Sequence, residues 1–519
     1  MQYSESDRSD ASTPEIRNVD TIFVAKHNRS ADLYQKIIEI TSELLVALED
    51  EKNYLMCDVL YAWAVKQQKI SIGTLWAQQV HYNLLDTIDK FEYFGELLEQ
   101  TLSGLSYLMK KCPNDGFDIF YAKLQETALY FLYYSIIVSR QPPSVVIKCG
   151  EAENHRRSRF WFNTEIRVLG GRAFKVDENG KGVQVECFLI TDDTARQLLA
   201  DAYHRIFENE EFSIEPQLAS FNLLEMNGLL AKFEDMRVSK KDHLRRDSVA
   251  TKRYCLCYNI QLNASHGIEL IGKKVSLPFA ILVGPKSEVE ARLFLERSFA
   301  NLVRQPLSDV PKFVSCQEMV DALDMKISVL QDKKHLLIRL NPDRDGEINL
   351  ENFTKLAVCQ EYSIKKVSNE GEWKLLPFSE WFFKTAEIIN KYLYQLWFEG
   401  LVYGFCGKDE AEELLRSLPY SCLLIRFSDV EYGKIKVSVR YRNGVIQHHW
   451  YNHADLSARP LQKELLTNHK FSEVDYIYPN INLKTALGDR QKPNDFQKPR
   501  ILNPTPFYFD NQGAATSSF

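Results

Sequence analysis

The chain has 519 residues, too many for a single hydrophobic core, and its length predicts three or four domains. A hydrophobic fraction of 45% and a charged fraction of 26% are typical of a folded globular protein and exclude a disordered chain. Because no run of eighteen apolar residues occurs and the first residues are polar, we expect neither membrane insertion nor a signal peptide. The net charge of −6 means that nucleic-acid binding would require a local basic patch.

The N-terminal third of the chain has a helical pattern. Residues 1 to about 30 are polar without periodicity, and we expect them to be mobile. Residues 32 to about 140 have apolar spacings of three and four, which predict long antiparallel helices, with a third helix at 117–138. The positions expected to be buried between the helices are Leu33, Ile37, Ile40, Leu44 and Leu48, followed by Leu84, Ile88, Phe91, Leu98, Leu102, Leu105 and Met109, with Gly95 as the one gap.

After Gln141 the pattern changes to alternating strands. Strands predicted at 162–168, 183–190 and 256–262, with Gly- and Asp-rich turns between them, favour an immunoglobulin-like β-sandwich. Residues 237–253 hold seven basic and two acidic residues, a local net charge of +5. This segment is either a surface that contacts DNA phosphates or a solvated loop without that role.

A helical connector is expected from about residue 301 to about 394. Within it, residues 341–352 resemble a calcium loop, with oxygen-bearing side chains at alternate positions and Gly346 at the sixth. Asn352 stands where a bidentate glutamate is required, so we expect no bound metal.

Residues 421–428, with the sequence SCLLIRFS, are typical of a buried strand. Alternation places Ile425 on one face, with Leu423 and Phe427, and Arg426 on the other, with Leu424 and Ser428. A buried guanidinium requires an anionic partner, which is either an internal acid such as Asp429 or Glu431 or a ligand carrying phosphate or carboxylate. A helix predicted at 408–417 precedes this strand, and a hairpin predicted at 435–451, with its turn at 442–444, follows it.

This order of helix, strand and hairpin resembles the opening of a Src-homology 2 (SH2) domain. Residues 381–428, with WFEGLVYGF before the helix, and YIYPN at 476–480 closely resemble the STAT family of transcription factors. The resemblance implies a multidomain α+β fold and a chain without the family's N-terminal domain or a long transactivation region. The implied parts are a coiled-coil helical bundle at 31–140, a β-sandwich DNA-binding domain at 141–300, an EF-hand-like helical linker at 301–395, an SH2 domain at 396–488 and a flexible phosphotyrosine tail at 489–519.

The resemblance also implies a phosphotyrosine pocket. Arg426 would grip the phosphate with both nitrogens, Lys408 would supply a second cation, and Ser428 would add a hydroxyl. Val430 stands where the family has a further serine. Tyr508 would be the phosphorylated residue, and the tail of each subunit would enter the pocket of the other in a homodimer. Three histidines are expected to line the groove rather than to bind metal: His448, His449 and His453.

For DNA, the resemblance implies phosphate contacts from Lys148, Lys240, Lys241, Arg245 and Arg246. Gly284 replaces the asparagine that reads a base in the family, so sequence preference is expected to differ.

The implied function is that of a signal-dependent, sequence-specific DNA-binding transcription factor in the cytoplasm and nucleus. Its implied partners are double-stranded DNA, phosphotyrosine peptides of receptors or kinases, a second copy of the chain, and recruited co-regulators. We expect no cofactor and no enzymatic activity. The alternative is a cytoplasmic SH2 adaptor that never binds DNA. A Cbl-type phosphotyrosine-binding module shares the order of bundle, EF-hand and SH2 domain, but it has no counterpart to the strand-rich segment.

Overall fold

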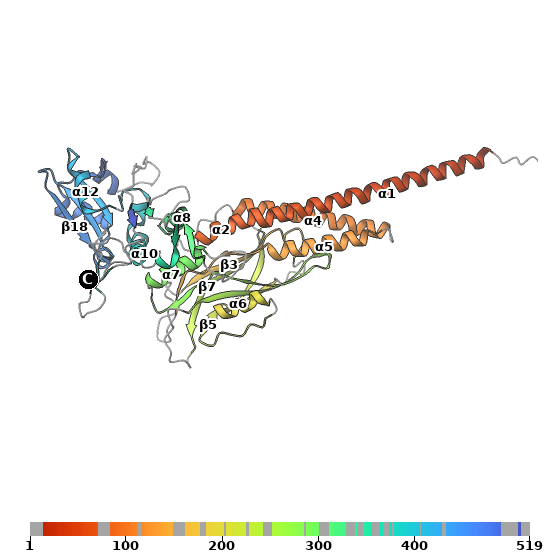
Figure 1. The fold of residues 1–519 in the computed structure, drawn as a ribbon, viewed down its shortest axis with the longest axis horizontal. Helices are drawn as coiled ribbons and strands as arrows, with labels where there is room; N and C mark the ends of the chain where they lie inside the picture. The colour runs from red at the N-terminus through yellow and green to blue at the C-terminus, as the bar shows by residue number, and fades with distance from the viewer. Residues whose placement is uncertain are drawn as a thin grey trace, which may run out of the picture.

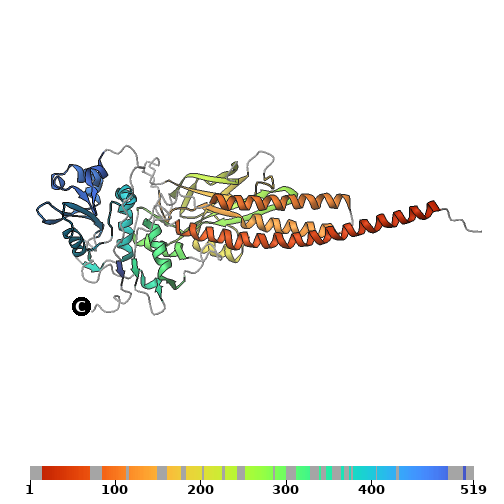
Figure 2. The ribbon, with the colours of Figure 1, turned by 90° about the horizontal axis from the view of Figure 1, so that it is seen from above.

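A computed structural model shows an elongated molecule (Figure 1). A helical bundle and a group of β-strands lie side by side, short helices connect them to a C-terminal domain at the opposite end, and α1 projects away from that domain (Figures 1 and 2). The structure describes residues 14–70, 84–112, 116–148, 161–176, 183–201, 204–224, 228–241, 252–284, 287–299, 311–327, 338–340, 346–353, 364–366, 373–375, 378–404, 406–427, 432–488 and 507–509.

Long helices form the bundle, as the apolar spacing predicts. The first begins at Pro14, inside the segment 1–30, where the sequence showed no helical periodicity. A short π-helical segment then connects this helix to the next one without a break. The expected third helix ends at Tyr134 instead of residue 138, because residues 136–140 form a strand. The helical elements are α1 (Pro14–Tyr54), η1 (Leu55–Leu60), α2 (Tyr61–Ile70), α4 (Leu84–Lys111) and α5 (Phe117–Tyr134).

The buried face of α4 is the predicted one, but the buried face of α1 is not. On α4, the predicted residues from Leu84 to Leu105 are buried, and Met109 is partly buried. On α1, the predicted positions Leu33, Ile37, Ile40 and Leu44 are exposed, and only Leu48 is buried. We call these four exposed residues the outer stripe. The helix buries an adjacent stripe instead, which we call the inner stripe: Tyr34, Ile38, Thr41, Leu45 and Leu48.

Two antiparallel sheets lie against the bundle and are joined by one strand. The first half of β6 pairs with β4, and its second half pairs with β7, so β6 passes from one sheet to the other. The predicted strands at 162–168, 183–190 and 256–262 correspond to β3, β4 and β8. The strands of these sheets are β1 (Ile136–Arg140), β3 (Phe162–Val168), β4 (Gln184–Thr191), β5 (Phe212–Glu215), β6 (Leu218–Leu224), β7 (Gly228–Lys240), β8 (Tyr254–Asn263) and β9 (Glu269–Val275), and α6 (Asp192–Ala200) follows β4. Two short strands, β2 (Val145–Ile147) and β10 (Ala280–Leu282), form a separate parallel pair.

The bundle and the sheets share a single hydrophobic core. At one place their backbones come into direct contact. A Cβ atom on Gly95 of α4 would lie 2.3 Å from the carbonyl oxygen of Gly170, which follows β3. One turn earlier on α4, Glu92 accepts hydrogen bonds of 3.1 Å from the backbone N–H groups of Gly170 and Arg172. Burial raises the pKa of Glu92 to about 7, although these two donors act in the opposite direction. Gly95, the gap in the predicted repeat, is therefore a point at which the backbones of bundle and sheet meet.

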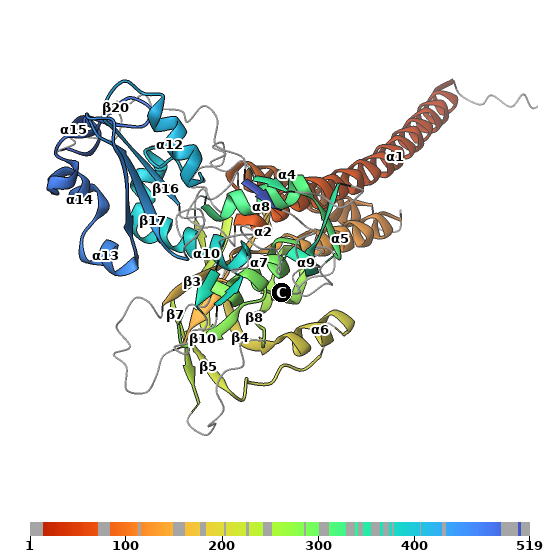
Figure 3. The same cartoon turned by 60° about the vertical axis from the view of Figure 1, so that its left-hand side comes forward.

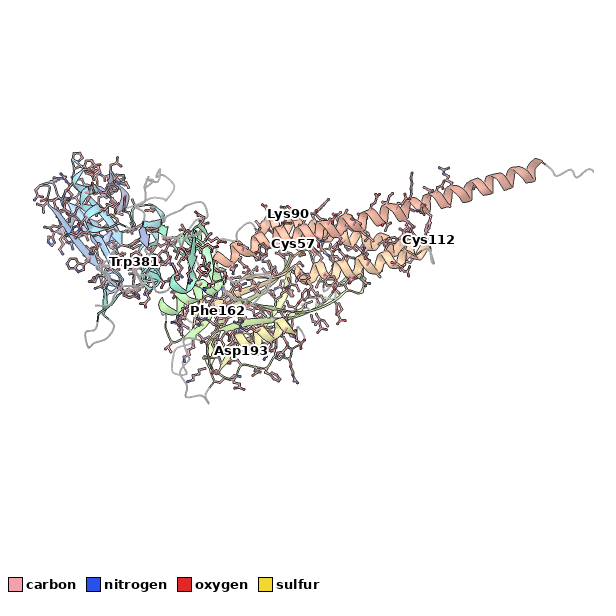
Figure 4. All side chains as sticks on the ribbon, viewed as in Figure 1. Cys57, Lys90, Cys112, Phe162, Asp193 and Trp381 are labelled. Carbon is pink, nitrogen blue, oxygen red and sulfur yellow. The ribbon has the colours of Figure 1, made fainter. Side chains whose placement is uncertain are left out.

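The linker and one face of the C-terminal sheet share a second core. Trp381 of α10, labelled in Figure 4, is buried in it. The linker contains short strands as well as the expected helices. Its elements are α7 (Ser287–Phe299), β11 (Phe313–Ser315), α8 (Cys316–Ile327), β12 (Ile338–Leu340), β13 (Glu347–Asn349), α9 (Leu350–Phe353), β14 (Ile364–Lys366), β15 (Trp373–Leu375), α10 (Phe378–Ile388), η5 (Ile389–Leu393) and α11 (Tyr394–Phe398).

The C-terminal domain is a sheet in the order β18-β17-β16-β19-β20, with helices on both sides (Figure 3). The predicted helix, buried strand and hairpin correspond to α12, β16 and the pair β17–β18. The elements are α12 (Lys408–Arg416), β16 (Cys422–Phe427), β17 (Ile435–Arg440), β18 (Ile446–Tyr451), α13 (His453–Ala458), α14 (Leu461–Thr467), β19 (Tyr476–Ile477), β20 (Ile481–Asn482) and α15 (Leu483–Leu487).

The tail is not entirely irregular, contrary to the expectation for residues 489–519. Within it, β21 (Phe507–Phe509) forms a parallel pair with β12 of the linker. No described helix is both long and apolar enough to cross a membrane.

Two glycine substitutions on α4 test the contact between bundle and sheet. Gly95→Ala is expected to lower the free energy of unfolding by about 2 kcal/mol, because the new methyl group must displace the backbone of Gly170. Gly104→Ala on the same helix is the matched control. Nothing lies within 4 Å of its new Cβ, so it should raise stability by about 1 kcal/mol through helix propensity. Urea unfolding measures both, and equal stabilisation by the two variants would refute the close approach.

Candidate functional site

Arg426 lies at the centre of the C-terminal sheet and is fully buried, with 0% of its surface exposed. Alternation along β16 places Ile425 and Phe427 in the core shared with the linker. Leu424 faces the opposite side, where α12 covers the sheet. The Arg426 Nη1 donates to the carbonyl oxygen of Cys406 at 2.9 Å, and Nε donates to the Ser438 hydroxyl at 3.2 Å. The predicted two-faced strand is therefore confirmed.

Hydrogen bonds connect Arg426 to the helix α12. The Ser438 hydroxyl lies 2.8 Å from Nδ1 of His448, and Nε2 of His448 lies 3.1 Å from Oε1 of Glu412. Because Nε of Arg426 donates to Ser438, the hydroxyl is able to donate onward to Nδ1, and Nε2–H then donates to the carboxylate. Burial lowers the pKa of His448, which favours this neutral imidazole. We call this series of hydrogen-bonded side chains the polar chain; it runs from Arg426 through Ser438 and His448 to Glu412.

Glu412 at the end of the polar chain also contacts two cations of its own helix. Its carboxylate lies 3.7 Å from the Lys408 Nζ and forms an ion pair with Arg416. The hydrogen bond from His448 holds the pKa of Glu412 below its usual range, and Arg416 and Lys408 act in the same direction. The Lys408 side chain is 60% exposed, so it lies at the surface end of the site while Arg426 lies at its base. An anion bound by Lys408 would therefore compete with Glu412.

The expected pocket residues are only partly covered by the structure. Four of them lie outside the described residues: Ser428, Asp429, Val430 and Glu431. The pairing of Arg426 with Asp429 or Glu431, the internal alternative to an external ligand, therefore also falls outside the described residues. The acid that the described residues bring nearest along hydrogen bonds is Glu412, which the sequence reasoning did not name.

The three histidines expected to line one groove lie at different places. His448 belongs to the polar chain, whereas His449 lies on the opposite face of β18 against Tyr441 and Phe471. His453 begins α13 and contacts Tyr392. Only His448 is therefore beside Arg426, and no group of metal-ligating side chains occurs among the residues that the structure covers.

Sequence reasoning placed His448 in the groove but missed Ser438 and the hydrogen bonds from Arg426 through Ser438 to His448, although the signal was present. The turn at 442–444 fixes the register of the hairpin, which pairs Ser438 with His448. The register between β16 and β17 pairs Leu424 with Ser438. The Ser438 side chain therefore lies on the same face of the sheet as Leu424 and Arg426. Counting outward from the turn would have found both residues.

Tyr508 lies in β21, where its backbone is the register partner of Arg339 in β12. The tail at this point is therefore attached to the linker through main-chain pairing rather than to the pocket at Arg426.

Two of the predicted DNA-contacting residues, Lys148 and Lys240, lie close together at one end of the sheets. The Lys148 Nζ is 5.9 Å from the centroid of the Phe212 ring, and Phe212 is the register partner of Lys240. Lys241 follows β7 and forms an ion pair of 3.2 Å with Glu208. Arg245, Arg246 and the rest of the segment 242–251 lie outside the described residues.

The basic segment at 237–253 is less positive than its sequence indicates. Acidic residues from a segment about thirty residues earlier lie against its ends: Arg237 pairs with Glu215, and Lys252 with Glu211. Arg253 is buried and donates to both carboxylate oxygens of Glu296. Arg237 and Lys240 belong to strand β7, whereas Lys241, Lys252 and Arg253 lie between the end of β7 and the start of β8. The local charge of +5 was therefore a poor measure of the field at this surface.

Comparisons with known proteins agree with the predicted family. The family model described as "Signal transducer and activator of transcription b N-terminal" matches residues 17–133, which cover nearly all of the bundle. The chain is 57% identical to "Signal transducer and activator of transcription b" of Caenorhabditis elegans, with 98% of each chain covered.

More distant relatives match as well. "Signal transducer and activator of transcription 1" of Caenorhabditis elegans is 23% identical, and its counterpart of Caenorhabditis briggsae is 22% identical. In both cases the match covers 88% of this chain and 70% of the relative. Sequence identity of 57% along nearly the whole length shows that this chain belongs to the STAT family of signal transducers and transcription factors.

Proposed function

We propose that this protein is a signal-dependent, sequence-specific DNA-binding transcription factor that dimerises through reciprocal contacts between an SH2 domain and a phosphotyrosine. The observation that carries the proposal is the fully buried Arg426 on a central strand, hydrogen-bonded in place on the same face as α12. A guanidinium held in this way loses little conformational entropy when it binds an anion.

The pocket would bind phosphotyrosine through cations at two depths. A phosphate carries nearly two negative charges at neutral pH and accepts several hydrogen bonds. Lys408 would meet it at the surface and Arg426 at the base, with Ser428 as a further donor. Because Glu412 already contacts Lys408, the incoming phosphate would take over that cation and leave Glu412 to Arg416 and His448.

The phosphate would come from Tyr508 of a second copy, and the first copy would return the same contact. A reciprocal exchange makes each contact twice, so two weak contacts combine into one stable dimer. The exchange requires β21 to leave β12, since the tail strand pairs with the linker in this structure. Receptor or kinase phosphotyrosines would occupy the same pocket before the exchange, in the cytoplasm, and the dimer would act in the nucleus with recruited co-regulators.

The DNA surface would be built around Lys148 and Lys240, with Lys241, Arg245 and Arg246 beside them. The proximity of Lys148 to the partner strand of Lys240 supports this location. Lys241 is expected to contribute less, because Glu208 already pairs with it.

An arginine-to-lysine change tests the pocket. Arg426→Lys keeps the charge but loses the guanidinium fork, so its affinity for a phosphorylated peptide of residues 500–515 should fall about tenfold or more. Arg442→Lys is the control, because Arg442 is exposed and pairs with Asp475 in the same domain. Calorimetry measures the affinity, and thermal unfolding establishes that both variants fold. Equal affinity of the Arg426→Lys variant and the wild type would refute the pocket.

A phenylalanine substitution tests the tail. Kinase treatment is expected to increase the sedimentation coefficient of the wild type, and Tyr508→Phe should abolish this kinase-dependent increase. Tyr107→Phe provides the control, since Tyr107 is an exposed tyrosine on α4. A kinase-dependent increase that persists without Tyr508 would assign the exchange to another residue.

Salt dependence tests the DNA surface. For the phosphorylated protein on duplex DNA, Lys148→Ala with Lys240→Ala should reduce the slope of log affinity against log salt by about 2. Lys232→Ala, an exposed lysine on the same strand β7, should leave the slope unchanged. If the wild type shows no salt-dependent binding to duplex DNA, the SH2 adaptor becomes the better account.

A further inference from the structure

The outer stripe of α1 is an apolar coiled-coil surface exposed on a long helix. Leu33 is 56% exposed, Ile37 38%, Ile40 60% and Leu44 39%. Their spacings of four, three and four residues are those of the a and d positions of a heptad repeat, which packs against a second helix. The inner stripe, on the adjacent face, already packs into the bundle. The helix α1 therefore has two apolar stripes: the bundle covers the inner stripe, and the outer stripe is exposed.

A row of charged residues runs beside the outer stripe. Arg29, Lys36, Glu43 and Asp50 recur every seven residues, each directly before an a position, and all four are exposed. The row is positive in its N-terminal half and negative in its C-terminal half. Residues in this position of a heptad set the partner and the orientation of a coiled coil.

We propose that the outer stripe binds the outer stripe of a second copy of this chain as an antiparallel, two-fold symmetric coiled coil. In the register that places Ile37 against Ile40 of the second copy, Leu33 lies against Leu44 of the second copy. Each of the four exposed apolar residues then gains an apolar partner, and two-fold symmetry makes every contact twice.

The same register pairs the charges. In an antiparallel coiled coil, the residues preceding the a positions face one another across the interface. This alignment places Lys36 opposite Glu43 of the second copy, and Arg29 opposite Asp50 of the second copy. One register therefore satisfies the apolar stripe and the charged row together, although the two were read from different residues.

A parallel arrangement lacks this complementarity. There, Lys36 would face Thr41 of the second copy, and Glu43 would face Leu48, which are buried in their own bundle. The shape of the molecule also favours the antiparallel arrangement. The helix α1 continues well past Cys112, the residue after α4 (Figure 4), so the second bundle would lie along the free end of α1. The inferred contact goes beyond the proposed function, because it requires no phosphate and does not use Arg426.

Sedimentation of the full chain without kinase treatment tests the contact. The wild type and Tyr508→Phe are both expected to associate, with a dissociation constant on the order of micromolar. Ile37→Glu with Ile40→Glu should remain monomeric under the same conditions. Val46→Glu is the matched control, since Val46 is 58% exposed on the same helix but lies outside the outer stripe. Circular dichroism checks that all variants keep their helix content.

A charge exchange tests the orientation. In a dimer of the Lys36→Glu variant, residue 36 of each copy is a glutamate that faces Glu43 of the other copy. In a dimer of the Glu43→Lys variant, two lysines face each other at the same two places. Each variant alone should therefore associate about tenfold more weakly. An equimolar mixture of the two variants should recover wild-type affinity, because every pair is then of opposite charge. A wild type that is monomeric at about 100 μM, or a mixture no stronger than its components, would overturn the proposal. Neither result would bear on the Arg426 pocket, which the phosphopeptide measures.

Discussion

A guanidinium enclosed in the centre of a sheet is the constraint around which the C-terminal domain is built. Removing Arg426 from water costs several kcal/mol unless its donors are satisfied, so the surrounding elements must present acceptors at fixed places. The strand β17 presents the Ser438 hydroxyl, and the segment before α12 presents the Cys406 carbonyl. The positions of a helix and of a neighbouring strand are therefore tied to one side chain.

The two faces of β16 connect this site to the rest of the molecule. Ile425 and Phe427 belong to the core shared with the linker, where Trp381 is also buried. Arg426 alternates with them and faces α12. A shift of β16 along its axis would disturb both faces at once, because period-two alternation couples them. The linker is thus packed directly beneath the proposed pocket, and the tail strand β21 pairs with that same linker.

The parts of the fold that depend on local pattern were predictable, and the parts that depend on distant neighbours were not. The helix, buried strand and hairpin around Arg426 were predicted correctly, since each is encoded in one short continuous segment. The choice of buried face on α1 was wrong because two heptad stripes run side by side, and the fully apolar one was preferred over the one that contains Thr41. Likewise, the charge of residues 237–253 was overestimated, because its acidic partners come from residues 208–215 and from Glu296.

The close approach of Gly95 to Gly170 has a mechanical consequence. Backbone atoms in contact leave no soft side chains to absorb a rotation, so the bundle and the sheets turn as one body. The 41 residues of α1 form a lever of about 60 Å. A tilt of about 5° at the sheet would carry the tip of that lever through about 5 Å. Any event that reorients the sheets is thereby magnified at the far end of the helix.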